Sequence, residues 1–140
     1  ELRRAGIRHV AMANPEHAPY GAAARQALQR AGVWEALRPK LVIGESVRHA
    51  LQFVQTGNAE CGLVARSVVG VPEVSWVEVD PRLYDPLRQA LAVIRGSRNT
   101  EAAQRFADYV TGPRARAVME RYGYRASPVV KSPPATKKAR

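Results

Sequence analysis

Two short runs, each at a point where a strand should give way to a helix, carry residue types suited to binding an anion. They are Ala18-Pro19-Tyr20-Gly21 and Gly44-Glu45-Ser46-Val47. The first N–H groups of a helix have no partner inside it, and the helix dipole places partial positive charge there. An oxyanion is therefore a natural guest at both junctions, held by neutral hydrogen-bond donors.

We expect four residues of these runs to contribute to such a site, each in a different way. As the N-cap, Ser46 accepts a hydrogen bond from the second or third helical N–H, which leaves the N–H of Val47 available. Gly21 allows close approach of backbone to ligand, and Tyr20 adds a hydroxyl donor. Such junctions occur in most α/β proteins, so the residues alone also allow a purely structural interpretation.

The other chemically capable residues give no sign of catalysis or of a metal site. Glu45 and Glu60 form no persuasive pair, because each fits a structural place beside a helix start and a turn. Cys61 lies within an expected strand, where a small buried hydrophobe is the simpler interpretation. One cysteine and three histidines offer no zinc spacing, and no Gly-x-Ser-x-Gly, Walker or Gly-x-Gly-x-x-Gly motif occurs. We expect no enzyme, no cofactor and no coordinated metal cation.

The elements that would position the junctions alternate between strands and helices. Strands are expected over residues 7–13, 41–44 and 61–65, and helices from Tyr20 and Val47, with a short helical piece over 33–37. Both longer helices repeat apolar residues at i, i+3, i+4 and i+7, and Gly32 suits the position after the first. The apolar run over 41–44 is typical of a strand buried on both faces, and 61–65 is the next buried strand. This alternation predicts a parallel sheet with right-handed crossovers, which brings both junctions to its carboxyl edge.

The pattern loosens after residue 70. Further strands are expected over 76–79 and 90–94, followed by a helix capped by Asn99 or Thr100 that ends at Gly112, and by a last helix that begins at Pro113. The apolar stripe expected on the first of these helices is Ala102, Phe106, Tyr109 and Val110, and the residues expected to face inward on the second are Ala115, Val118, Met119 and Tyr122.

Composition and charge limit the class of protein. With 140 residues and 46% hydrophobic content, the chain can bury a core without disulfides, and it has no run long and apolar enough for a membrane span. The net charge is +10, but residues 131–140 carry four basic groups and no acid, in a tail with too few apolar residues to fold. The remaining arginines are dispersed, and the set includes Arg25, Arg48, Arg66, Arg88 and Arg105. A solvated basic face is favoured over a nucleic-acid footprint.

Several runs in register resemble the periplasmic molybdate-binding proteins of bacterial ABC importers. These runs are Asn14-Pro15-Glu16-His17-Ala18-Pro19-Tyr20-Gly21, Lys40-Leu41-Val42-Ile43-Gly44-Glu45-Ser46-Val47, Ala50-Leu51-Gln52-Phe53-Val54-Gln55-Thr56-Gly57-Asn58-Ala59 and Tyr122-Gly123-Tyr124. Their order and spacing match from about Ile7 to Tyr124. The resemblance implies two α/β lobes of the type II periplasmic binding fold that close on a tetrahedral dianion, molybdate or tungstate.

The resemblance also implies which residues touch the anion. It carries over the backbone N–H and the hydroxyl of Tyr20 and the backbone N–H of Val47, with Gly21 and Ser46 in support. Some members place a further tyrosine donor on the strand that here ends at Ala65. Because this chain has alanine there, Tyr20 can supply the phenol instead. In the family a whole lobe precedes the strand at Ile7 and donates serine or threonine hydroxyls, so we expect an incomplete site here.

The fold class we predict is α/β, a parallel-sheet lobe of a type II periplasmic binding protein whose first lobe is missing. The second lobe would span residues 6–84. A strand and helices that return to the first lobe would span residues 85–124, and a disordered basic tail would span residues 125–140. By resemblance the chain is periplasmic and serves the membrane permease of an ABC importer. We also expect a homodimer formed through the C-terminal stripes, and no nucleic-acid partner. A basic nucleic-acid-binding domain and an anion-sensing regulatory domain of the same fold are the alternatives.

Overall fold

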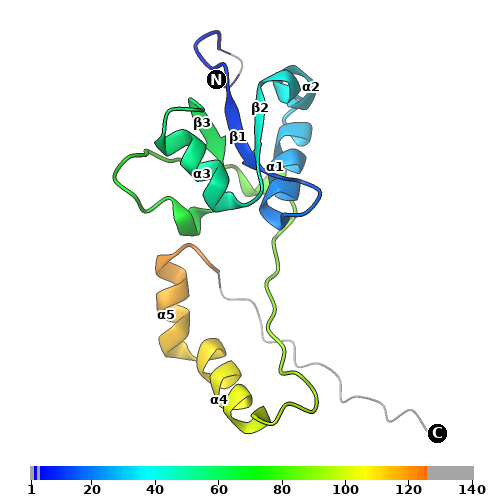
Figure 1. The fold of residues 1–140 in the computed structure, drawn as a ribbon, viewed down its shortest axis with the longest axis vertical. Helices are drawn as coiled ribbons and strands as arrows, with labels where there is room; N and C mark the ends of the chain where they lie inside the picture. The colour runs from blue at the N-terminus through cyan, green and yellow to red at the C-terminus, as the bar shows by residue number, and fades with distance from the viewer. Residues whose placement is uncertain (1, 3, 126–140) are drawn as a thin grey trace, which may run out of the picture. The chain divides into compact units, whose positions relative to one another are not determined.

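The chain divides into two compact units, Glu1–Gln89 and Ala90–Arg140. The computed structural model describes residue 2 and residues 4–125, so residues 126–140 of the predicted basic tail lie outside the described residues. The first unit holds a sheet with its helices, and the second holds two helices (Figure 1). Among the described residues, no helix has the length and apolar character needed to cross a membrane.

The first unit is built on a parallel sheet, as predicted. Its strands are β1 (Val10–Ala13), β2 (Leu41–Gly44) and β3 (Cys61–Leu63), in the order β2-β1-β3. Both outer strands run parallel to β1. Only the central strand is buried along its whole length, and Ile43 on β2 is 44% exposed. The prediction that β2 and β3 are fully buried strands is therefore wrong, because each forms an edge of the sheet.

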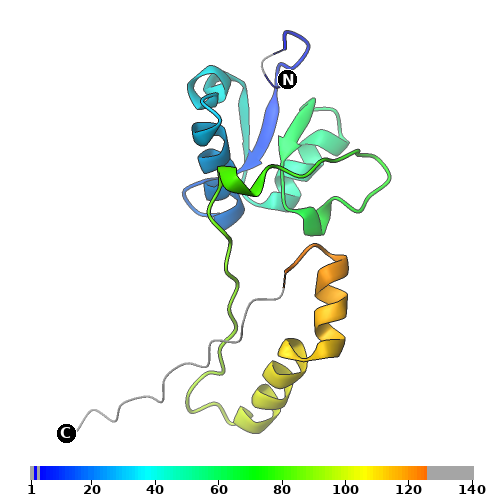
Figure 2. The same cartoon turned by 180° about the vertical axis from the view of Figure 1, so that it is seen from behind.

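The helices of the first unit cover both faces of this sheet. They are α1 (Pro19–Arg30), the short α2 (Trp34–Leu37) and α3 (Val47–Gln55). Successive residues of a strand point to opposite faces: Met12 packs with Leu28 of α1, whereas Ala11 packs with Ala50 of α3. Helices α1 and α3 therefore lie on opposite faces of the sheet (Figure 1 and Figure 2).

Local signals explain where these helices begin and end. Pro19 occupies the first turn of α1, and Gly32 follows the helix with a φ of 67°, a value that favours glycine. Helix α2 passes directly into a 3-10 turn, η1 (Arg38–Lys40), and β2 begins at the next residue. Helix α3 begins directly after the predicted N-cap, Ser46.

The segment after β3 corrects one predicted strand. It contains two 3-10 turns, η2 (Arg66–Val68) and η3 (Pro81–Leu83), and residues 76–79 between them are irregular. Val77 is 90% exposed, and Glu78 instead forms an ion pair with Arg66. A strand requires a partner strand, and the described sheet offers none to this segment.

The second unit contains α4 (Thr100–Thr111) and α5 (Pro113–Arg121). The strand predicted over 90–94 is wrong, since these residues are irregular and have no partner strand among the described residues. Of the residues in the two predicted apolar stripes, Ala115 is buried and Val110 is half-buried, while the others are exposed. Within the two helices, Ala107 and Ala115 are the buried residues, while Phe106 is 64% exposed. Two short helices cover only a narrow seam of small side chains, so the large apolar side chains stay outside it.

Candidate functional site

The two predicted junctions lie at the same edge of the sheet. In the β1–β2 register Ala13 pairs with Gly44, and the Asn14 N–H donates to the Gly44 carbonyl at 2.8 Å. From these neighbouring strand ends, the chain leaves to α1 on one face and to α3 on the other. Such a point, where adjacent strands feed helices on opposite faces, is where open α/β sheets bind ligands.

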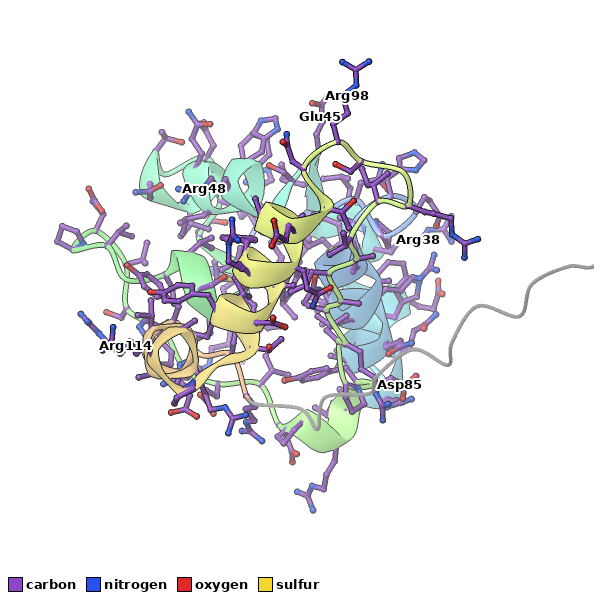
Figure 3. All side chains as sticks on the ribbon, turned by 90° about the horizontal axis from the view of Figure 1, so that it is seen from below. Arg38, Glu45, Arg48, Asp85, Arg98 and Arg114 are labelled. Carbon is purple, nitrogen blue, oxygen red and sulfur yellow. The ribbon has the colours of Figure 1, made fainter. Side chains whose placement is uncertain are left out.

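The start of α3 has the predicted cap geometry. Ser46 is extended, with φ −142° and ψ 167°, and its hydroxyl accepts a hydrogen bond from the His49 N–H at 3.2 Å. Within the described part of the chain, the Val47 N–H has no protein acceptor. Glu45 and Arg48 flank the cap and are exposed (Figure 3). The α3 terminus thus presents a backbone donor beside the strand ends.

The start of α1 is shaped by backbone contacts within the preceding turn. Its N-cap, Ala18, has no capping side chain, and the Ala18 N–H donates to the Asn14 carbonyl at 2.9 Å. The Asn14 side chain accepts from the Glu16 N–H, also at 2.9 Å. Tyr20 follows Pro19 in the first helical turn and is half-buried. The turn therefore fixes the position of Tyr20 relative to the end of β1.

Gly21 and Gly44 let the two helices approach the sheet edge closely. A Cβ at Gly21 would lie 2.7 Å from the carbonyl carbon of Asn14, and a Cβ at Gly44 would lie 2.8 Å from the Ala50 nitrogen. Either contact is closer than real Cβ atoms show. The structure thus gives Gly21 a packing role that its sequence context did not reveal, whereas its approach to a ligand stays a prediction.

The third strand brings a cation, Arg66, to this edge. The sequence alone indicated only that Arg66 was one of several dispersed arginines. Ala65, just beyond β3, is 4% exposed, and Arg66 follows it. Arg66 forms an ion pair with Glu78, with 2.6 Å between Nη1 and Oε1, and its guanidinium lies 5.4 Å from the centre of the Trp76 ring. The available signal was an arginine directly after the strand predicted over residues 61–65.

The polar groups at the opposite, amino edge of the sheet are structural. The Glu60 carboxylate accepts hydrogen bonds from the backbone N–H groups of His9 at 2.7 Å and Arg8 at 3.1 Å, and these bonds hold the pKa of Glu60 below its usual value. Burial raises the pKa of the neighbouring Cys61 thiol, which disfavours the reactive thiolate. Among the described residues, no group of three or more His, Cys, Asp or Glu could hold a metal ion.

Comparisons with known proteins place this geometry in a family. The sequence model described as bacterial extracellular solute-binding protein matches residues 1–125. The chain is 43% identical to the molybdate-binding protein ModA of Azotobacter vinelandii over 127 residues, which cover 88% of this chain and 50% of that protein. It is 36% identical to ModA of Escherichia coli over 119 residues, 82% of this chain and 45% of that protein.

Solved structures agree with the sequence relatives. The periplasmic molybdate-binding protein of Azotobacter vinelandii superposes with a TM-score of 0.78 at 28% identity, covering 94% of this chain and 58% of that one. A substrate-binding domain of a putative molybdenum ABC transporter from Clostridium difficile gives a TM-score of 0.72. The chain spans about half the length of the curated relatives it matches. The match favours a binding protein over a nucleic-acid-binding or sensory domain, and the chain belongs to the family of bacterial extracellular solute-binding proteins.

Proposed function

We propose that this chain binds a tetrahedral oxyanion, molybdate or tungstate, as part of the periplasmic binding protein of an ABC importer. The observation that carries the proposal is the paired origin of α1 and α3 at the adjacent carboxyl ends of β1 and β2. Helix N-termini at such a point suit an anion. The relatives named as molybdate-binding proteins supply the identity of the anion.

The donors in this proposal are neutral. Val47 provides a backbone N–H, and Tyr20 provides its backbone N–H and its hydroxyl, with Ser46 and Gly21 in support. Fixed dipoles can select an anion by size and still release it, as a transport protein must. The chain needs no catalytic group and no cofactor in this role, and the molybdate or tungstate is cargo.

The proposed site draws on more than this chain contains. Because the chain spans about half the length of its relatives, we expect the remaining donors to come from the other half of the binding protein. The chain by itself should bind molybdate weakly, since the dianion keeps part of its hydration shell. The division into a lobe over 6–84 and a returning segment over 85–124 belongs to the same proposal, as do the permease partner and the absence of a nucleic-acid partner.

Replacing Val47 by proline tests the backbone donor directly. Proline is well tolerated at the first position of a helix, and the extended backbone of Ser46 suits a residue before proline. The variant therefore removes one N–H with little strain. In calorimetric titrations with molybdate, tungstate and sulfate, we expect Val47→Pro to weaken binding and the matched Val47→Ala to leave it nearly unchanged. Equal affinities for the two variants would contradict the assigned donor.

We also propose that the chain on its own, without another lobe to cover the returning segment, forms a homodimer through the exposed apolar side chains of α4 and α5. Phe106, Tyr109 and Tyr122 are each more than half exposed, and such a patch usually marks an interface. A second copy of the chain could cover it by symmetric pairing of the same helices. Sedimentation equilibrium should detect a dimer that Phe106→Ser weakens. A monomer at high protein concentration would contradict this proposal.

A further inference from the structure

A cation at the same edge of the sheet as the proposed anion site is held by a carboxylate. Arg66 Nη1 lies 2.6 Å from Glu78 Oε1, and the guanidinium also faces the Trp76 ring at 5.4 Å. The two side chains of the ion pair are about half exposed, at 48% for Arg66 and 51% for Glu78. The pair is therefore an accessible surface group and not part of the core.

The topology places this pair at the edge of the sheet from which α1 and α3 begin. Strand β3 is the parallel neighbour of β1, so the chain leaves β3 at the same edge as it leaves β1. Arg66 opens η2, which packs against α3, the helix that carries the Val47 donor. A charge at Arg66 therefore contributes to the electrostatic field at the sheet edge where α3 begins.

The ion pair decides how much of that charge an incoming anion experiences. An uncompensated guanidinium would attract every dianion through a long-range field that does not depend on anion size. A carboxylate at 2.6 Å offsets most of this field. Arg25 on α1 has a similar partner, since its Nη1 lies 2.6 Å from the Glu16 carboxylate in the turn before the helix. Arg66 and Arg25 are thus electrostatically masked, whereas Arg48 at the start of α3 has no ion-pair partner among the described residues.

We propose that Glu78 masks Arg66 and so lowers the affinity and the salt dependence of the anion site without affecting its size selection. This inference rests on the proposed function, because it assumes that the anion binds at the start of α3. The substitution Glu78→Gln keeps a hydrogen-bond acceptor for Arg66 and removes the charge. It should strengthen binding of molybdate, tungstate and sulfate by the same factor, roughly two- to five-fold at low ionic strength, and the gain should disappear in high salt.

The experiment is a set of calorimetric titrations of the full chain at low and high salt. The matched control is Glu73→Gln, which removes the same charge from the same irregular segment. The Glu73 carboxylate accepts a hydrogen bond from the side chain of Gln55, the last residue of α3. The double variant Arg66→Gln/Glu78→Gln should return to the salt dependence of the unmodified chain, and Glu73→Gln should leave the affinity unchanged. A purely structural role for Glu78 would instead lower the thermal stability and weaken binding.

The outcomes separate this inference from the function on which it rests. If the unmodified chain binds the anions and Val47→Pro weakens binding, but Glu78→Gln has no effect or the same effect as Glu73→Gln, the masking role is wrong and the site stands. If no anion binds the unmodified chain even at high concentration, the proposed function fails and the masking role fails with it. A gain for molybdate that sulfate does not share would also contradict the inference, because a distant charge cannot distinguish the two anions.

Discussion

The two compact units differ in how far their large apolar side chains are buried. In the first, Met12 and Leu37 have no exposed surface, because helices cover both faces of the sheet. In the second, α4 and α5 are as regular as α1, yet Phe106 and Tyr109 are more than half exposed. Helix formation follows from local sequence, whereas burial requires a partner surface. The first unit contains that surface within its own residues.

The largest expected effect is on the free energy of unfolding, when one methionine in each unit is replaced by alanine. Met12→Ala removes a fully buried side chain and should lower the free energy of unfolding by about 2–5 kcal/mol. Met119→Ala affects a side chain that is 38% exposed and should cost less than about 1 kcal/mol. Urea unfolding followed by circular dichroism at low protein concentration measures both. Equal losses would show that the second unit has a core like that of the first.

A pair of tyrosines extends the comparison to function. Tyr20→Phe should weaken molybdate binding by roughly 1.5–3 kcal/mol, the value of one hydrogen bond to a charged group, if the hydroxyl contacts the anion. Tyr109→Phe, on the exposed face of α4, should leave the affinity unchanged. Calorimetric titration of both variants gives the two values. An unchanged affinity for Tyr20→Phe would restrict the contribution of this residue to its backbone N–H.

Two glycines of the first unit differ in how closely other atoms surround them. Gly21→Ala would force a Cβ against the backbone of the turn after β1 and should destabilise the first unit by about 1–3 kcal/mol. Gly6→Ala is the matched control, because a Cβ there meets nothing within 4 Å. Thermal unfolding monitored by tryptophan fluorescence suits both variants, since Trp34 and Trp76 lie in the first unit. A fully stable Gly21→Ala variant would refute the close packing of α1.

The smallest expected effect is on pH dependence. The pKa of Glu60 is lowered in the folded state, so its carboxylate stabilises the fold above its ordinary pKa and this contribution is lost as pH falls through the lowered value. Glu60→Gln should therefore reduce stability at pH 7 and flatten its decline in acid. Glu101→Gln on α4, whose side chain is 91% exposed, should change neither. Unfolding free energies between pH 7 and pH 3 provide the measurement, and matching profiles for the two variants would contradict it.

The parts of the fold that sequence predicted correctly are those with local signals. Ser46 caps α3 and Gly32 follows α1 with a positive φ, as their residue types indicate. The strands predicted over 76–79 and 90–94 failed because no partner strand is available to them in the described sheet. The Arg66–Glu78 pair was missed because it joins residues twelve positions apart across an irregular segment, and no local pattern encodes such a contact.

The proposed anion site lies where α1 and α3 begin. The most direct test is to titrate molybdate into the ¹⁵N-labelled chain and follow backbone amide resonances. We predict saturable shifts of the Tyr20 and Val47 amides, reproduced by tungstate, while amides on the exposed helix α5, such as that of Arg116, stay in place. Shifts that spare both helix starts, or that are confined to the basic second unit, would contradict the claim.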